Sequence, residues 1–212
     1  SNSNVKISDV VIKENSSDAG GGIWMRNSDA HLGNVLIEGN YAEDEGGGII
    51  LDNSVLEMHN VTIKNNNARK GGGAHFKLFS HSQIFNSFIL DNESDFGSAF
   101  HCDNQTNIEI ENSIIMNNRN IVNGVISNDP GSILLESTSN VEITNSIIRY
   151  NLPSEFYINN ETNSISINYS NILGGESAIE INESNPNPEI IWGPNNIDSN
   201  PLFCNQSSGD FT

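Results

Sequence analysis

Cationic side chains are scarce in this chain. Of its 212 residues, 9 are lysine or arginine and 27 are aspartate or glutamate, which gives a formal net charge of −18. Neutralisation of phosphates by cations dominates nucleic-acid binding, so this balance argues strongly against a nucleic-acid partner. The same shortage of cations argues against docking on a strongly anionic lipid surface.

Cysteine and long apolar runs are also in short supply. The two cysteines, Cys102 and Cys204, are too few for a disulfide framework, and we expect both to be unpaired, Cys102 as a surface thiol and Cys204 in a C-terminal tail. No apolar run approaches the roughly 18 residues that a membrane-spanning helix needs, so we expect no direct membrane insertion of this segment. The sequence opens without a secretory leader, and we expect its start at Ser1 to be a processed or cloned boundary.

Asparagine, isoleucine and serine are abundant instead, with 36, 28 and 27 residues. Disordered chains contain few β-branched residues, so the isoleucines exclude disorder. The abundance reflects an internal repeat. Seven segments share one frame: VKISDVVIKEN (5–15), AHLGNVLIEGN (30–40), LEMHNVTIKNN (56–66), SQIFNSFILDN (82–92), IEIENSIIMNN (108–118), VEITNSIIRYN (141–151) and ISINYSNILGG (165–175).

The repeat length is close to 26 residues. The last residues of successive segments are 25, 26, 26, 26, 33 and 24 positions apart, so the sixth unit carries an insertion, which includes the turn signal Asp129-Pro130-Gly131. Apolar residues alternate within each segment, which predicts two short strands. A third strand opens each unit after a glycine-rich turn, as in GGGIWMR (20–26), GGGIILD (46–52), GGGAHFK (71–77) and GSAFHCD (97–103).

Three short strands and three turns per unit, with no hairpin signals between them, predict an all-β solenoid. Equivalent strands stack in parallel about 4.8 Å apart, and stacking buries the apolar face that one unit cannot bury alone. Crossover handedness favours the right-handed form. We therefore predict a right-handed parallel β-helix of about seven coils with a C-terminal capping segment.

The asparagines occupy the turns of this frame. Asparagine and glycine tolerate left-handed backbone, and stacked asparagine side chains can hydrogen-bond coil to coil. We predict two asparagine ladders, one at Asn34, Asn60, Asn86, Asn112 and Asn145, the other at Asn15, Asn40, Asn66, Asn92, Asn118 and Asn151. The triple glycines are predicted to be turns rather than phosphate-binding loops, because neither a helix nor a Lys-Ser/Thr pair follows them.

The repeat resembles the right-handed parallel β-helix domains of bacterial secreted and surface proteins. Gly-Gly-aliphatic strand entries such as Gly21-Gly22-Ile23, paired with exits such as Ile12-Lys13-Glu14-Asn15, are similar to repeats of polymorphic outer-membrane proteins and autotransporter passengers. The resemblance implies export by a signal that lies outside this segment, and a secreted or cell-surface location. Fold does not fix activity.

The C-terminal part departs from the repeat. The segments YSNI (169–172), NIDSNPLF (196–203) and GDF (209–211) resemble the closing segment of anchored β-helix repeat proteins, which implies a fragment of a longer exported protein. We expect the β-helix to occupy residues 1–181 and a cap or tail to occupy residues 182–212. Four prolines and Trp192 in this segment predict a cover for the open end of the rod.

One outward stripe is the candidate ligand surface. The frame turns Ile23 and Met25 inward and gives an outward column at Trp24, Ile50, His75, Phe100, Ile126 and Tyr157, beside a second column at Arg26, Asp52, Lys77 and Cys102. Flat apolar groups flanked by polar ones suit a glycan, and large exposed apolar patches usually mark binding surfaces. Two alternatives stay open: the long acidic turn or a neighbouring domain covers the stripe, or a one-residue slip in the fourth coil turns Phe100 into the core and exposes His101.

Catalytic and metal signals are weaker. The same fold also hosts polysaccharide hydrolases and lyases. The clustered aspartates, Gly-His-Gly and Arg-x-Lys of the hydrolases do not occur here. Lyases place several cations on the strand face, and only Arg26, Lys77 and Arg69-Lys70 lie near the stripe here. The five histidines show no close ligand spacing, and the frame sends His75 and His101 to opposite faces. No cofactor is required. Calcium is the metal that suits the acidic turns at Glu43, Asp44 and Glu45 and at Asp91, Glu93 and Asp95.

The sequence thus favours a monomeric, non-catalytic domain of an exported cell-surface protein, serving adhesion or glycan binding along one strand face. Its partner would be a glycan or another host or cell-surface ligand. The alternatives are a polysaccharide lyase or glycoside hydrolase acting at the same face, and a structural spacer or stalk.

Overall fold

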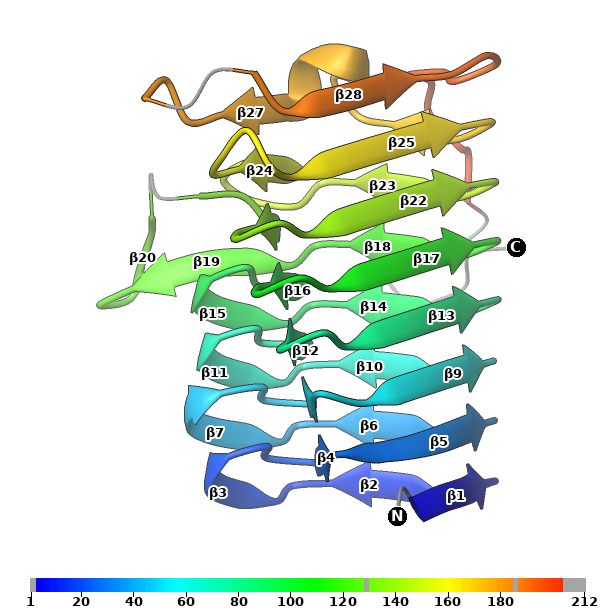
Figure 1. Cartoon of the computed structure of the whole chain (residues 1–212), viewed down its shortest axis with the longest axis vertical. Helices are drawn as coiled ribbons and strands as arrows, with labels where there is room; N and C mark the ends of the chain where they lie inside the picture. Colours follow the sequence, from blue (N-terminus) through cyan, green and yellow to red (C-terminus); the bar gives the residue numbers. More distant parts are fainter. Residues whose placement is uncertain (1–2, 128–129, 185–186, 204–212) are drawn as a thin grey trace.

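The chain winds into a rod of stacked coils (Figure 1). The computed structural model describes residues 3–127, 130–184 and 187–203. In this part of the chain, strands pair in parallel with their counterparts one coil away, except for one antiparallel hairpin. Two of the sheets have seven strands, one for each coil, and helix within the described residues is limited to the 3-10 turn η1 (Gly175–Ala178). The predicted fold class is confirmed.

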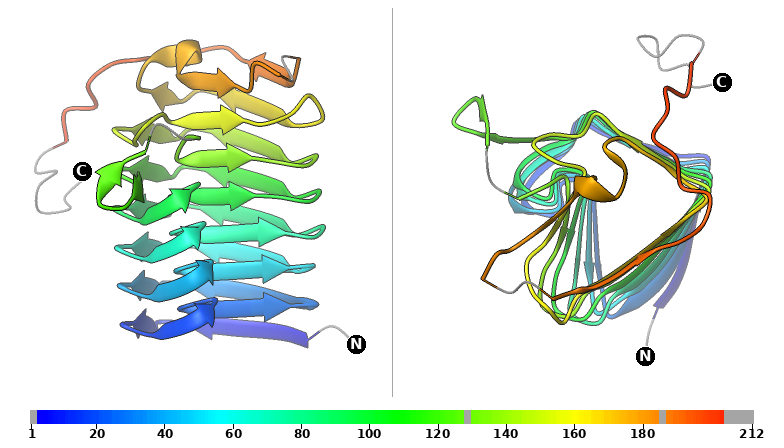
Figure 2. Two further views of the ribbon diagram at one scale, coloured as in Figure 1. Left: turned by 90° about the vertical axis from the view of Figure 1, so that its left-hand side faces the viewer. Right: turned by 90° about the horizontal axis from the view of Figure 1, so that it is seen from above.

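Four sheets form the sides of the rod, here named A to D in chain order (Figure 2). Sheet A contains β1 (Ser3–Ser8), β5 (Ser28–Gly33), β9 (Val55–His59), β13 (His81–Phe85), β17 (Asn107–Glu111), β22 (Asn140–Thr144), β25 (Ser164–Asn168) and β28 (Glu189–Trp192). Sheet B contains β2 (Val11–Lys13), β6 (Leu36–Glu38), β10 (Thr62–Lys64), β14 (Phe88–Leu90), β18 (Ile114–Met116), β23 (Ile147–Arg149) and β26 (Asn171–Ile172). These two sheets are the two strands predicted from the repeated segments.

Sheets C and D complete each coil. Sheet C contains β3 (Ser16–Ala19), β7 (Tyr41–Glu45), β11 (Asn67–Lys70), β15 (Glu93–Phe96), β19 (Arg119–Val122) and β20 (Val125–Ile126). Sheet D contains β4 (Ile23–Arg26), β8 (Ile49–Asp52), β12 (Ala74–Lys77), β16 (Phe100–Cys102), β21 (Ile133–Leu135), β24 (Phe156–Ile158) and β27 (Ile179–Ile181). Sheet D is the predicted strand after the glycine turns.

Sheet C was missed, because its strands carry few apolar residues. Most of its coils bury a single small residue, in the column Ala42, Ala68, Ser94 and Asn120. So weak an alternation of apolar and polar residues cannot be told from a polar turn in the sequence. The prediction of three strands per coil is therefore wrong, and the acidic run Glu43-Asp44-Glu45 lies in strand β7 rather than in a turn.

Isoleucine columns fill the interior of the rod. On sheet B the parallel register stacks Ile12, Ile37, Ile63, Ile89, Ile115, Ile148 and Ile172. From Ile37 to Ile172 these side chains are completely buried. Each buried aliphatic side chain of this size stabilises the fold by about 1.5–3 kcal/mol, so the core depends on identical residues meeting at each step.

The second predicted asparagine ladder is present, and it is buried from Asn40 to Asn151. From Asn15 to Asn118, each side-chain Nδ2 donates to the Oδ1 of the asparagine one coil later, at 2.9–3.0 Å. The same oxygen accepts the backbone N–H of the earlier asparagine, as Asn92 Oδ1 does for Asn66 at 3.0 Å. The ladder therefore satisfies polar groups that no water reaches.

The first predicted ladder does not form a continuous series of hydrogen bonds between asparagines. Asn34, Asn60, Asn86, Asn112 and Asn145 do adopt left-handed backbone, with φ between 51° and 55°. Their side chains are exposed or partly exposed, and the column includes one link between asparagines, from Asn60 to Asn34 at 3.2 Å. Buried serines follow these turns, and the backbone N–H groups of Ser87, Ser113 and Ser146 each donate to the next serine Oγ in the column at 3.1–3.2 Å. This serine ladder was not predicted.

The C-terminal segment covers the last coil. Strand β28 pairs with β25 in register, so that Ile165 faces Ile190 and Ile167 faces Trp192. Ile190 and Trp192 pack against the core. Sheet A thus runs past Ile181, the predicted end of the β-helix. Cys204 and the rest of the predicted tail lie outside the described residues.

Replacing Asn92 with alanine tests the ladder. The change leaves the Asn66 backbone N–H, the Asn66 side chain and the Ile63 carbonyl without their partner. We expect the free energy of unfolding in urea to fall by about 2–4 kcal/mol. The control is Asn86→Gly, which keeps the left-handed turn at an exposed site and should cost about 0.5 kcal/mol or less. Equal losses in the two variants would contradict a structural role for the buried ladder.

Candidate functional site

The outward column of sheet D differs from the prediction in its fourth coil. The register aligns Ala74 with Phe100 and His75 with His101, 26 residues apart, whereas the predicted column advances 25 residues from His75 to Phe100. Phe100 is consequently fully buried in the core, as the one-residue slip requires. The prediction that Phe100 lies on the stripe, and that His75 and His101 face opposite ways, is wrong.

Two further members of the predicted columns also move. Ile126 lies in β20, which pairs with β19 as an antiparallel hairpin, and Leu134 takes its place on sheet D. Asp129, in the predicted turn, lies outside the described residues. Cys102 points into the core with no exposed surface, and burial raises the pKa of its thiol far above its usual range. The expectation of a surface thiol is therefore wrong, whereas Tyr157 does lie in the outward column.

The corrected column is mostly covered. Trp24 is 55% exposed, but Ile50, His75, His101 and Leu134 are at most 1% exposed. The glycine turns bring sheet C against this column: a Cβ on Gly46 would lie 2.3 Å from Ile50 Cγ1, and Glu45 Oε1 lies 3.8 Å from His75 Nδ1. Ile50 and His75 are thus unavailable to a glycan.

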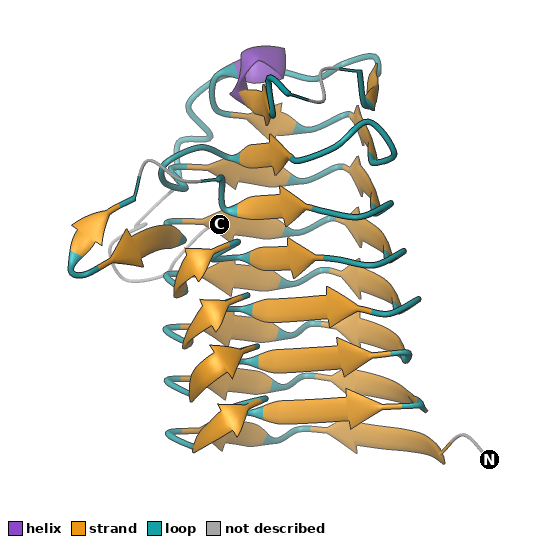
Figure 3. Cartoon of the chain, turned by 60° about the vertical axis from the view of Figure 1, so that its left-hand side comes forward, coloured by secondary structure: helices purple, strands orange, loops and turns teal. Residues whose placement is uncertain are grey.

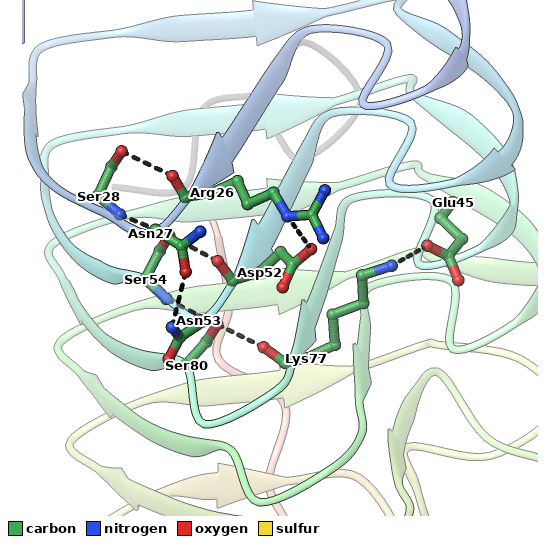
Figure 4. A network of polar contacts seen from close by, with 9 residues as sticks. All are labelled: Arg26, Asn27, Ser28, Glu45, Asp52, Asn53, Ser54, Lys77 and Ser80. Atoms are coloured by element: carbon green, nitrogen blue, oxygen red, sulfur yellow. Dashed lines mark hydrogen bonds and ion pairs between the residues drawn. The ribbon is translucent and has the colours of Figure 1, made fainter. Parts of the chain in front are cut away.

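The second column forms an ion-pair network (Figure 4). Arg26 Nε lies 3.3 Å from Asp52 Oδ2, and Lys77 pairs with Glu45. Asp52 is almost fully buried, so it serves the network rather than a ligand. Trp24 and Arg26 stay exposed beside a hollow of about 400 Å³ at the first coil, which is lined also by core residues such as Ile23 and Leu32.

The acidic residues predicted for calcium do not form one cluster, although Asp91 and Glu93 line the same small hollow. Asp44 pairs with Arg69, and Glu45 is already paired with Lys77. Asp91 is exposed at a turn, while Glu93 and Asp95 are partly buried in β15. Among the described residues, three His, Cys, Asp or Glu ligand atoms lie within 4.8 Å of one another only in the set His75, His101 and Asp103.

A second hollow, here called the notch, lies on the side of the rod where sheet C stops. The hairpin β19–β20 projects from the rod, and in the next coil a single bridge, between Arg119 and Leu152, continues this sheet (Figure 3). The missing strands leave a space of about 490 Å³. It is lined by Tyr150, Asn151, Leu152, Pro153, Ser154, Glu155, Leu173, Gly174, Ser177, Ala178 and Glu180. The notch was not predicted.

Tyr150 is the aromatic side chain of the notch. It is 39% exposed, and its left-handed backbone, φ 61°, follows from its place in the turn before Asn151. The Arg149 guanidinium lies 5.5 Å from the ring centroid, within cation–π range. Arg149 Nη1 itself donates to Asn171 Oδ1 at 2.7 Å and to Asp198 Oδ1 at 2.8 Å. The ring is therefore held in place by an anchored cation.

Glu155 is the buried carboxyl of the notch. It is 4% exposed, and it accepts a hydrogen bond from Asn151 Nδ2 where the asparagine ladder ends. Burial raises the pKa of Glu155 to about 7, against the opposing effect of the Asn151 hydrogen bond. Glu180, which also lines the notch, is exposed.

Glu155 should make stability depend on pH. Because its pKa is raised in the fold, its favourable contribution is present below about pH 4.5 and is lost as the pH rises to about 7. Glu155→Gln retains the acceptor for Asn151 but cannot ionise, so it removes the loss of stability at higher pH. We expect the variant to gain about 3 kcal/mol over wild type between pH 4.5 and 8 in urea unfolding. With Glu142→Gln as the exposed control, a gain of equal size in both variants would contradict the assignment.

Comparison with known proteins agrees with the geometry. The structure has no helix long and apolar enough to cross a membrane in the described part of the chain. Neither curated proteins nor solved structures gave a match. A family model described as the right-handed β-helix region matches residues 1–129, more than half of the chain. The chain therefore belongs to the right-handed β-helix family.

Proposed function

We propose that this β-helix is a non-catalytic domain of an exported cell-surface protein and that it binds a glycan in the notch beside Tyr150. The resemblance of its repeats to polymorphic outer-membrane proteins and autotransporter passengers supports the surface location. An elongated rod with a net charge of −18 stays soluble and extended, which suits display outside a cell.

The single observation that carries glycan binding is the composition of the notch. An exposed aromatic ring, held by Arg149, stands beside apolar side chains of Leu152, Pro153 and Leu173. Sugar rings present flat C–H faces to such groups, and their hydroxyls need a few polar partners, here Glu155 and Glu180.

The charges of the notch favour a neutral glycan. Two carboxyl groups line it, and the nearest guanidinium, that of Arg149, is already bound to Asn171 and Asp198. A polyuronate would meet repulsion from the Glu180 carboxylate without a free cation to offset it. This disfavours pectin-like and alginate-like ligands, and with them the lyase alternative.

Glycoside hydrolysis is a second candidate that rests on Glu155. A carboxylic acid that keeps its proton near pH 7 is what general acid catalysis requires, and Glu180 supplies a second carboxyl in the same notch. The bond from Asn151 gives Glu155 a structural role that needs no substrate, so we place binding first. A spacer without ligand is the remaining alternative.

A glycan array with neutral and acidic oligosaccharides tests the proposal. Tyr150→Asn removes the ring and keeps a residue that tolerates this turn, since Asn117 occupies the equivalent position one coil earlier. We expect neutral glycans to bind wild type and to bind this variant at least 10-fold more weakly, because stacking on the ring is lost.

Trp24→Ile is the matched control, since Ile50 occupies the next position of its column. It should bind as wild type does. Loss of glycan binding in Trp24→Ile alone would place the site at the first coil. If wild type binds no glycan, the proposal fails and the spacer alternative remains. Release of reducing ends by wild type but not by Glu155→Gln would establish hydrolysis instead. A calcium titration of wild type tests the separate prediction that the acidic residues hold this ion.

A further inference from the structure

Two buried histidines stack on the outer face of sheet D. His75 and His101 are neighbours in register, and their ring centroids lie 4.6 Å apart. Each is 1% exposed. The positions before and after them in the same column are Ile50 and Leu134, which fill the space without polar atoms. Packing alone therefore does not require imidazole at these two positions.

Three of the four ring nitrogens have no hydrogen-bond partner within the described ranges. They are Nδ1 and Nε2 of His75 and Nδ1 of His101. Buried polar atoms are nearly always paired, and an unpaired lone pair in an apolar column points to a ligand that completes it.

The fourth nitrogen is held by a carboxylate. His101 Nε2 lies 2.8 Å from Glu136 Oε2, and Glu136 Oε1 accepts a bond from Asn159 Nδ2 at 2.8 Å. A carboxylate only accepts hydrogen bonds, so in a neutral His101 ring Nε2 carries the proton and Nδ1 keeps its lone pair. A carboxylate behind a histidine is the usual outer partner of a metal-binding imidazole.

Asp103 supplies a third ligand atom. Its carboxylate and one nitrogen of each histidine lie within 4.8 Å of one another, and its backbone N–H is fixed by the Phe76 carbonyl at 2.9 Å. Neither ring nitrogen of His75 has a hydrogen-bond partner among the described residues, so a lone pair of this ring is available to a cation. Lys77, a cation two residues further along the same strand, is paired with Glu45.

We propose that His75, His101 and Asp103 form a binding site for one divalent transition metal ion, with Zn²⁺ as the best match. Two imidazoles and one carboxylate suit zinc better than calcium, which prefers oxygen ligands throughout. Zinc holds such ligands at roughly 2.0–2.2 Å, so binding requires the three atoms, which lie within 4.8 Å of one another, to draw closer together. Glu136 orients His101. The fourth position is left for Glu45 or a water molecule.

Zinc titration of the chelator-treated protein tests the site. Because the ligands are buried, Zn²⁺ is added both to the folded protein and during refolding, and Co²⁺ is used as the spectroscopic probe. We expect one ion per chain, a Co²⁺ visible spectrum of low-coordinate type, and a rise in Tm with Zn²⁺. A folded wild type that retains no Zn²⁺ or Co²⁺ by either route would overturn the proposal.

The column itself supplies the variants. His75→Ile and His101→Leu copy Ile50 and Leu134, so both should fold, and each should lose at least 100-fold in zinc affinity. Glu136→Gln should lose roughly 10–100-fold. The control His81→Asn copies Asn107, its partner on sheet A, and should bind as wild type does. Unchanged zinc binding in His75→Ile and His101→Leu would assign the ion to another site and refute the proposal.

Discussion

The buried asparagine ladder is the constraint on which the rest of the rod depends. Where the chain turns from sheet B to sheet C, backbone N–H and C=O groups lie inside the rod, away from water. Each ladder asparagine satisfies such groups in its own and neighbouring coils, as Asn66 does through Ile37 and Asn92. A buried group left unpaired costs about 1–3 kcal/mol, so the chain must return to the same register at each coil. That register in turn brings isoleucine onto isoleucine in the core.

The end of the ladder determines where the candidate site lies. Asn151 is the last asparagine of the series, and it donates to Glu155 rather than to another asparagine. From this point the chain passes to sheet D without a full sheet C strand, which opens the notch beside Tyr150. One local change thus accounts for the end of a sheet, for a buried carboxyl with a raised pKa and for an exposed aromatic ring.

Much of the fold follows from the sequence, and the site does not. Inward isoleucines and turn asparagines repeat at fixed intervals, so sheets A, B and D and the buried ladder were predictable. Sheet C was not, because one alanine or serine per strand leaves no apolar pattern. The predicted register of sheet D was wrong by one residue at Phe100, and this error placed His75 and His101 on opposite faces. The notch depends on the absence of a strand after Asn151, and a polar connection gives no sign of such an absence.

Exchange of asparagine side-chain amide protons, followed by NMR, tests the central role of the ladder most directly. The account predicts that the amides of Asn40, Asn66, Asn92 and Asn118 exchange orders of magnitude more slowly than those of exposed Asn60 and Asn86, because their release requires the coils to separate. Equally fast exchange of both groups would show that the ladder is open to water and would contradict the account.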